Sequence, residues 1–238
     1  MELQIENGVL KDLGMLYFDD LDIKEVDIPY GVTKIGYDAC RNYGCRLERI
    51  TIPDTVTEID EYAFCACGLI KNFTIPDSVI SIGKSAFEYL RNLENVTFGK
   101  SVISIGDRAF NNCWSLKSIT LGNSVTSIGE FAFTGDEKLE SVTFGNSLTS
   151  IGRFAFNGCT SLKSITIPDS VIEIGESAFE YCPSLTSLTI GKGLKVFGDY
   201  AFGDCKNLKN IMLPDKEFKL DRKAFDDISN FIISYKEN

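Results

Sequence analysis

Apolar and polar residues alternate along this chain in a pattern that returns every 23 residues. The dipeptide Ala-Phe marks the phase, with its alanine at positions 63, 86, 109, 132, 155, 178, 201 and 224. A degenerate copy, Ala39-Cys40, stands one residue out of step, and the extra residue lies in 41–46. Because a fixed period of this length is typical of stacked repeats, it decides the architecture before any other signal.

Four further apolar columns keep the same step, beginning at Ile50, Ile52, Val56 and Ile59. The first two belong to the phrase L-x-x-I-x-I, whose alternation and β-branched residues predict a strand with one buried face. Pro-Asp or Gly-Asn then predicts a turn, V-x-x-I-G predicts a second short extended piece, and x-x-A-F-x-x-C predicts a turn or two of helix. One unit cannot bury its own apolar side, so the sequence predicts a solenoid of stacked units with a parallel sheet along one side.

The full phrase L-x-x-I-T-I-P-x-x-V-x-x-I-G-x-x-A-F-x-x-C resembles the BspA-like, or treponemal-type, leucine-rich repeats, over about residues 20–225. The resemblance implies an α/β solenoid, a right-handed superhelix of about nine 23-residue units with the parallel sheet on its concave face. Short strands and short helical turns are then expected on the convex side. The opening LQIENGVLKDL is similar to the hairpin-like first unit of such domains.

The ends of a solenoid need protection, because a terminal unit exposes the core. We therefore expect one leucine-rich repeat domain over 1–238, with an N-terminal cap at 1–19, repeats at 20–225 and a C-terminal cap at 226–238. Within the last segment, FIISYK is expected to form a final strand.

Composition narrows the range of functions. The chain has 34 acidic and 24 basic residues and a formal charge of −10, which disfavours a nucleic-acid partner. It has no histidine, the commonest general base and metal ligand, although carboxylate and lysine chemistry stay possible. No apolar run approaches the ~20 residues that a membrane helix needs, and residues 1–14 show no secretion leader. We expect no membrane insertion, no cofactor, no metal and a monomeric chain.

The candidate binding residues occupy two rows that the core does not fix. By the alternation of a strand, both rows point away from the core. The resemblance places partner binding on this concave face, and the candidates are Arg49, Thr51, Asn72, Thr74, Asn95, Thr97, Ser118, Thr120, Ser141, Thr143, Ser164, Thr166, Ser187 and Thr189. Two other interpretations stay open: threonine favours strands whatever their function, and equally spaced threonines also suit an ice-binding array, although a curved row fits flat ice poorly.

Five of the eight cysteines share one column of the repeat, in which Leu90 and Asp136 fill the gaps. Leu90 indicates a slot for a modest apolar side chain, so packing in the core is the favoured interpretation. A zinc site is disfavoured because a column spreads its ligands along a line. The column consists of Cys67, Cys113, Cys159, Cys182 and Cys205, and a disulfide bridge stays possible nearby, among Cys40, Cys45, Cys65 and Cys67.

No catalytic constellation emerges. Carboxylates such as Glu58, Asp60 and Glu61 are expected on the convex or lateral side, solvated, and Trp114 is expected to be exposed. The sequence favours a non-enzymatic, adhesin-like module that binds a protein or glycan partner; the alternative is a structural spacer or a self-assembling surface-coat component. The resemblance suggests the cell surface or secretion, whereas the missing leader suggests otherwise.

Overall fold

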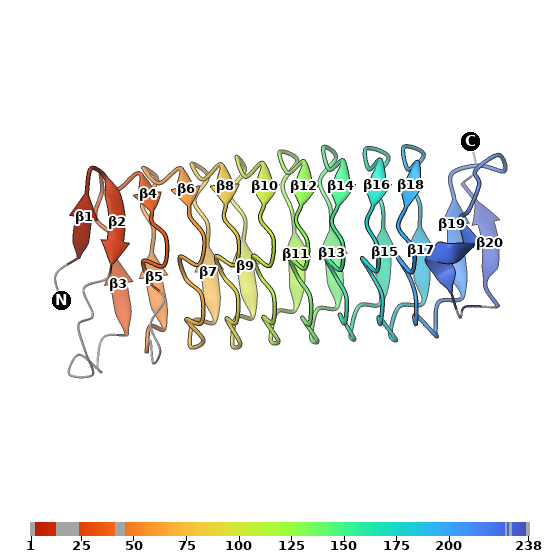
Figure 1. The fold of residues 1–238 in the computed structure, drawn as a ribbon, viewed down its shortest axis with the longest axis horizontal. Coiled ribbons are helices and arrows are strands. Elements are labelled where there is room, and N and C mark those ends of the chain that lie inside the picture. The colour runs from red at the N-terminus through yellow and green to blue at the C-terminus, as the bar shows by residue number, and fades with distance from the viewer. Residues whose placement is uncertain (1–2, 13–23, 41–45, 227, 229, 237–238) are drawn as a thin grey trace.

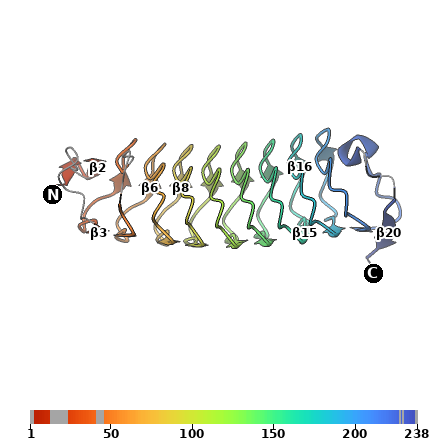
Figure 2. The same ribbon diagram turned by 90° about the horizontal axis from the view of Figure 1, so that it is seen from below.

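The computed structural model describes residues 3–12, 24–40, 46–226, 228 and 230–236. Its turns stand side by side in one row, from β1 at one end to β20 at the other (Figure 1). The view turned by 90° separates the strands into two layers, with β3, β15 and β20 in the lower one and β6, β8 and β16 above (Figure 2). From β3 to β18 each turn of chain contributes a strand to both layers, which confirms the predicted solenoid.

The lower layer in Figure 2 is the long-strand sheet, in which every strand is parallel to its neighbours. Its strands, in spatial order, are β7 (Asn72–Thr74), β9 (Asn95–Thr97), β11 (Ser118–Thr120), β13 (Ser141–Thr143), β15 (Ser164–Thr166), β17 (Ser187–Thr189), β19 (Asn210–Leu213) and β20 (Ile232–Tyr235). A separate parallel pair, β3 (Glu25–Asp27) and β5 (Arg49–Thr51), continues the row toward the N-terminal end.

The upper layer is the short-strand sheet, and it begins with an antiparallel hairpin of β1 and β2. The hairpin confirms the expected form of the first unit. The strands, in spatial order, are β1 (Gln4–Glu6), β2 (Val9–Asp12), β4 (Lys34–Ile35), β6 (Glu58–Ile59), β8 (Ser81–Ile82), β10 (Ser104–Ile105), β12 (Ser127–Ile128), β14 (Ser150–Ile151), β16 (Glu173–Ile174) and β18 (Val196–Phe197).

Neighbouring turns pair without slippage. In the long-strand sheet Ser118 pairs with Ser141, and in the short-strand sheet Ile128 pairs with Ile151, so in the regular turns each residue faces the one 23 positions later. The step differs at the two ends, where Glu25 pairs with Arg49 and Asn210 with Ile232. Glycine keeps the turns close: a Cβ on Gly152 would lie only 2.6 Å from the carbonyl carbon of Gly129. The period read from the sequence is therefore the register of the sheets.

The Ala-Phe segments are not helical, which corrects the prediction of short helical turns. In seven of the eight Ala-Phe copies the residue before the alanine has a positive φ, for example Ser85 at 53° and Arg108 at 57°, and a left-handed residue cannot continue a right-handed helix. The backbone bonds across turns instead, as in Phe87 N–H to the Ala109 carbonyl at 2.7 Å. In the described residues one 3₁₀ helix, η1 (Arg222–Phe225), forms at the last Ala-Phe copy.

A column of phenylalanines fills the core between the two layers. The rings of Phe64, Phe87, Phe110, Phe133, Phe156, Phe179, Phe202 and Phe225 stack with centroids 4.9 to 5.3 Å apart. This spacing is close to the ~4.8 Å between paired strands. The phenylalanine of each turn thus packs on the phenylalanine of the next turn without any shift in strand register.

The cysteine column is buried, as predicted. The thiols of Cys113 and Cys159 each donate to a phenylalanine carbonyl of the preceding turn, Phe87 and Phe133, at 3.3 Å. Cys45 lies outside the described residues, so the possible bridge near it stays a prediction.

Asp136 is a carboxylate in this apolar column, with no exposed surface. Its Oδ1 accepts the Cys113 N–H at 2.8 Å, while its Oδ2 is buried without a hydrogen bond in the described structure. Burial raises the pKa of Asp136 well above its usual range, and the Cys113 N–H opposes this only in part. The neutral carboxyl is therefore the favoured form at this position.

Phe156→Ala tests the ring column. The substitution should lower the free energy of unfolding by about 3–5 kcal/mol, because it leaves a cavity in the middle of the stack. Urea denaturation followed by circular dichroism measures the change. Ile103→Ala, at a side chain that is 46% exposed, is the control and should shift stability by less than about 0.5 kcal/mol. A loss below about 1 kcal/mol for Phe156→Ala would contradict the role of the stack.

Asp136 gives stability a pH dependence of fixed sign. The pKa of Asp136 in the folded chain lies above the unfolded value of ~3.9. The stability linked to its protonation is therefore complete below the unfolded pKa and is lost as the pH rises through the folded pKa. Between about pH 4 and pH 8 the urea midpoint of the wild type should therefore fall relative to Asp136→Asn. Asp136→Cys, which restores the residue of the column, should be more stable than the wild type at about pH 8. A difference in urea midpoint between the wild type and Asp136→Asn that does not change with pH would contradict this assignment.

Candidate binding face

The candidate residues lie together on the outer side of the long-strand sheet and of the β3–β5 pair, which we call the threonine face. Each three-residue strand contributes its first and third residues outward and its second inward, as in the exposed Ser118 and Thr120 around the buried Ile119. Twelve of the fourteen predicted residues are exposed, and the other two, Ser187 and Thr189, are half-buried. The structure thus brings all fourteen to one surface, as strand alternation predicts.

The threonine face changes character along its length. At the N-terminal end Arg49 contacts Glu25 at 2.6 Å and Asp27 at 3.5 Å, and its guanidinium lowers the pKa of Glu25. In the middle the face is neutral, and Asn95 Nδ2 donates to Asn72 Oδ1 at 2.8 Å. At the C-terminal end it is apolar, with Met212 38% exposed and Ile232 69% exposed. A partner on the middle turns therefore meets hydroxyls and amides rather than fixed charge.

A row of alternating charge borders this face, and sequence reasoning missed it. The row occupies the position before each strand and reads Glu48, Lys71, Glu94, Lys117, Glu140, Lys163. Lys117 pairs with Glu94 and Lys163 with Glu140, and these lysines lower the pKa of both carboxylates through hydrogen bonds and charge. The signal was present in the sequence, because the sign of the charge alternates with each 23-residue step.

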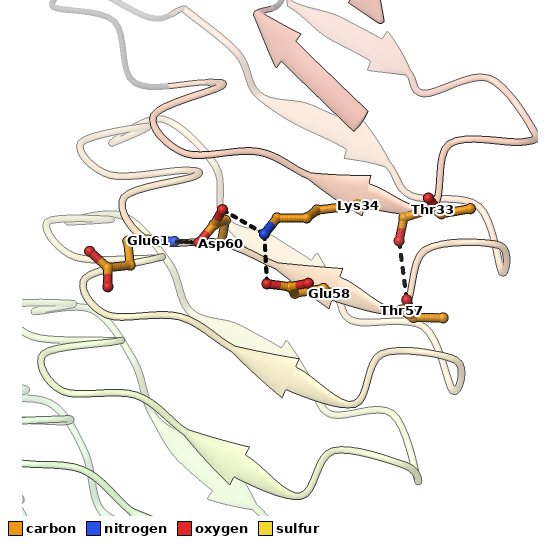
Figure 3. Close-up of polar contacts among 6 residues, drawn as sticks. All are labelled: Thr33, Lys34, Thr57, Glu58, Asp60 and Glu61. Atoms are coloured by element: carbon orange, nitrogen blue, oxygen red, sulfur yellow. Dashed lines mark hydrogen bonds and ion pairs between the residues drawn. The ribbon is translucent and has the colours of Figure 1, made fainter. Parts of the chain in front are cut away.

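The predicted lateral carboxylates lie at the short-strand sheet. Figure 3 shows Lys34 of β4 between two of them, with its Nζ 2.7 Å from Glu58 and 2.8 Å from Asp60. The hydrogen bonds that Lys34 donates to the Asp60 and Glu58 carboxylates raise its pKa. Thr57 Oγ1 also donates to the Thr33 carbonyl in this cluster, and Asp60 accepts the N–H of Glu61. The side chains satisfy one another, so the cluster ties the first turns together.

No group of three or more metal-ligating side chains comes together among the described residues. The described residues also hold no helix of the length and apolarity that crossing a membrane requires. Trp114 is 40% exposed, as predicted, and the Arg91 guanidinium lies 4.8 Å from its ring.

Comparison with known proteins supports the architecture. A family model described as the BspA type leucine rich repeat region, in 6 copies, matches residues 11–140 and 126–235. A leucine rich cell surface protein of Faecalibacterium prausnitzii A2-165 is 28% identical, with a TM-score of 0.54, over 82% of this chain and 61% of that protein. The T. pallidum leucine rich repeat protein is 30% identical, with a TM-score of 0.61, over 64% of this chain and 72% of that one.

More distant matches show the fold alone. The pneumococcal vaccine antigen PcpA is 23% identical, with a TM-score of 0.55, over 90% of this chain and 63% of that protein. The chain therefore spans about three fifths of the length of the F. prausnitzii and pneumococcal proteins, at 61% and 63%. No curated protein matches it.

The charged border predicts a measurable titration. In Lys163→Ala, the pKa of Glu140 should rise toward its ordinary value, because the hydrogen bond and the charge that lower it are both removed. Carboxyl-carbon NMR shifts recorded against pH measure this. Lys209→Ala, in the same row but two turns further on, is the control and should leave Glu140 unchanged. A Glu140 pKa that is equal in the wild type and Lys163→Ala would contradict the pairing.

Proposed function

We propose that this chain, which belongs to the BspA-type leucine-rich repeat family, is a non-enzymatic, adhesin-like interaction module that binds a protein or glycan through its threonine face. The observation that carries the proposal is the exposure of a long, regular, uncharged surface on the middle turns. A solenoid presents such a surface over many turns without ordering any flexible segment, so a partner finds it preorganised.

The border supports the same assignment. Paired charges of alternating sign leave little net field beside the face, so recognition depends on hydrogen bonds and shape more than on long-range attraction. The F. prausnitzii protein is described as a cell surface protein, and we propose that this chain also works at the cell surface or outside the cell.

A second candidate function is a spacer or a self-assembling coat component. It is favoured by β20, the last strand of the long-strand sheet, in which all four residues are exposed. An edge strand with an exposed Ile232 can template pairing with another chain. Self-association that depends on β20 would favour this candidate over the first.

The test is a triple substitution, Thr120→Lys, Thr143→Lys and Thr166→Lys, on the exposed middle of the face. Pull-downs from host-cell and matrix extracts should lose a band that the wild type captures, because three long charged side chains block the surface. The matched control is Ile103→Lys, Thr149→Lys and Ile172→Lys, which adds the same charge to exposed positions at the short-strand sheet. It should keep the band. Equal capture by both triple variants and the wild type would place the binding surface elsewhere.

A further inference from the structure

The ladder of the long-strand sheet is not uniform. Three residue pairs join β11 to β13 and β15 to β17, but a single pair joins β9 to β11 and β13 to β15. At the closed junctions the N–H after the strand also bonds across, as from Leu121 to Thr143 at 2.9 Å and from Ile167 to Thr189 at 2.8 Å. No equivalent bond joins Phe144 to Thr166 among these described residues. The sheet therefore opens between β13 and β15.

A larger side chain lies at each of these two open junctions. Both of these open junctions follow a Val-Thr-Phe sequence, which puts Phe98 or Phe144 in a column that elsewhere holds leucine or isoleucine. The two rings turn edge-on to the core stack, with centroids 5.5 Å from Phe110 and 5.8 Å from Phe156. At β13, Phe144 is 9% exposed, whereas Ile167 in the next turn has no exposed surface. Phe144 thus brings a small part of its apolar surface to the opening.

A hollow of about 580 Å³ lies at the junction of β13 and β15. Its apolar lining includes Val142, Phe144 and the half-buried Pro168, and its polar lining includes Thr143, Thr166, Asn146, Ser170, Asp169 and Lys236. Lys236, which follows the last strand β20, places its Nζ 3.6 Å from Oδ1 of Asp169. Two threonines of the proposed binding face therefore border the hollow, together with an amide, hydroxyls and one ion pair.

This lining matches the chemistry of a sugar ring. A pyranose presents an apolar face of C–H groups and an edge of hydroxyls, so it needs an apolar floor with hydrogen-bonding groups around it. The hollow lies within the ~300–1,000 Å³ that ligand sites typically occupy. Its two charged groups, Asp169 and Lys236, offset each other, which favours a neutral ligand over an anion or a cation. The backbone groups of Phe144 and Thr166 that do not pair with each other add a donor and an acceptor.

We propose that this hollow binds a neutral pyranose unit of a glycan. The proposal rests on the proposed function, since it places the contact on the same face, and it chooses glycan as the class of partner. The rest of the threonine face then guides the remainder of the glycan along the sheet.

The experiment is an NMR titration of the ¹⁵N-labelled full chain with lactose, cellobiose and N,N′-diacetylchitobiose at concentrations on the order of the millimolar affinities that single sugars show. At least one disaccharide should shift the amides of Thr143, Phe144, Thr166 and Asp169 more than those of other turns. Asp169→Asn should weaken that binding about tenfold, the loss expected for one charge-assisted hydrogen bond.

The chain offers a matched control for this variant. Asp77 occupies the same column and accepts the N–H of Lys100 at 3.0 Å, as Asp169 accepts the N–H of Lys192 at 2.9 Å. Asp77→Asn makes the same change far from the hollow and should bind like the wild type. Phe144→Leu, which installs the residue found at the closed β11 junction, should close the opening and abolish the shifts without unfolding the chain.

Two results would overturn the proposal. The first is the absence of disaccharide shifts, or shifts centred on other turns. The second is equal affinity in the wild type, Asp169→Asn and Phe144→Leu. If either occurs while the triple threonine variant still loses its captured partner, the threonine face keeps its function and only the glycan assignment fails. If the triple variant also keeps its partner, the proposed function fails as well.

Discussion

The structure depends on one constraint, the repetition of identical contacts at the spacing of paired β-strands. A stacked ring sits 4.9 to 5.3 Å from the next, and the backbone ladders on both layers advance by the same step. A side chain that suits one turn therefore suits its neighbours. This explains why the columns tolerate little variety, and why one turn by itself would expose the surface that its neighbours cover.

Because of the same constraint, the residues that differ from the rest of their column are the ones that bring a different chemical group to the structure. Asp136 replaces a cysteine in the buried column and brings a titratable group where none is needed for packing. Phe144 puts a larger side chain into a column at a junction where the ladder is reduced to one pair. Regular positions build the scaffold, so a position that breaks the column without unfolding the chain is a natural place to look for function.

The threonine face shows how a regular scaffold presents a surface of outward side chains. Strand alternation forces two residues of every turn outward, and the core cannot select them. Their side chains are short and neutral in the middle turns, and the flanking lysines and glutamates pair with each other. The result is a face with many donors and acceptors and little net charge, which suits recognition by hydrogen bonds at close range.

The sequence by itself determined the solenoid, the register, the buried columns and the fourteen outward positions, because each follows from a period of 23 and an alternation of two. It did not determine the backbone of the Ala-Phe segments, since helical spacing of apolar residues does not reveal a positive φ such as that of Ser85. Only the tertiary structure decided where the ladder opens and that Lys236 reaches Asp169. These features depend on how neighbouring turns fit together, and the pattern within a single repeat does not contain that information.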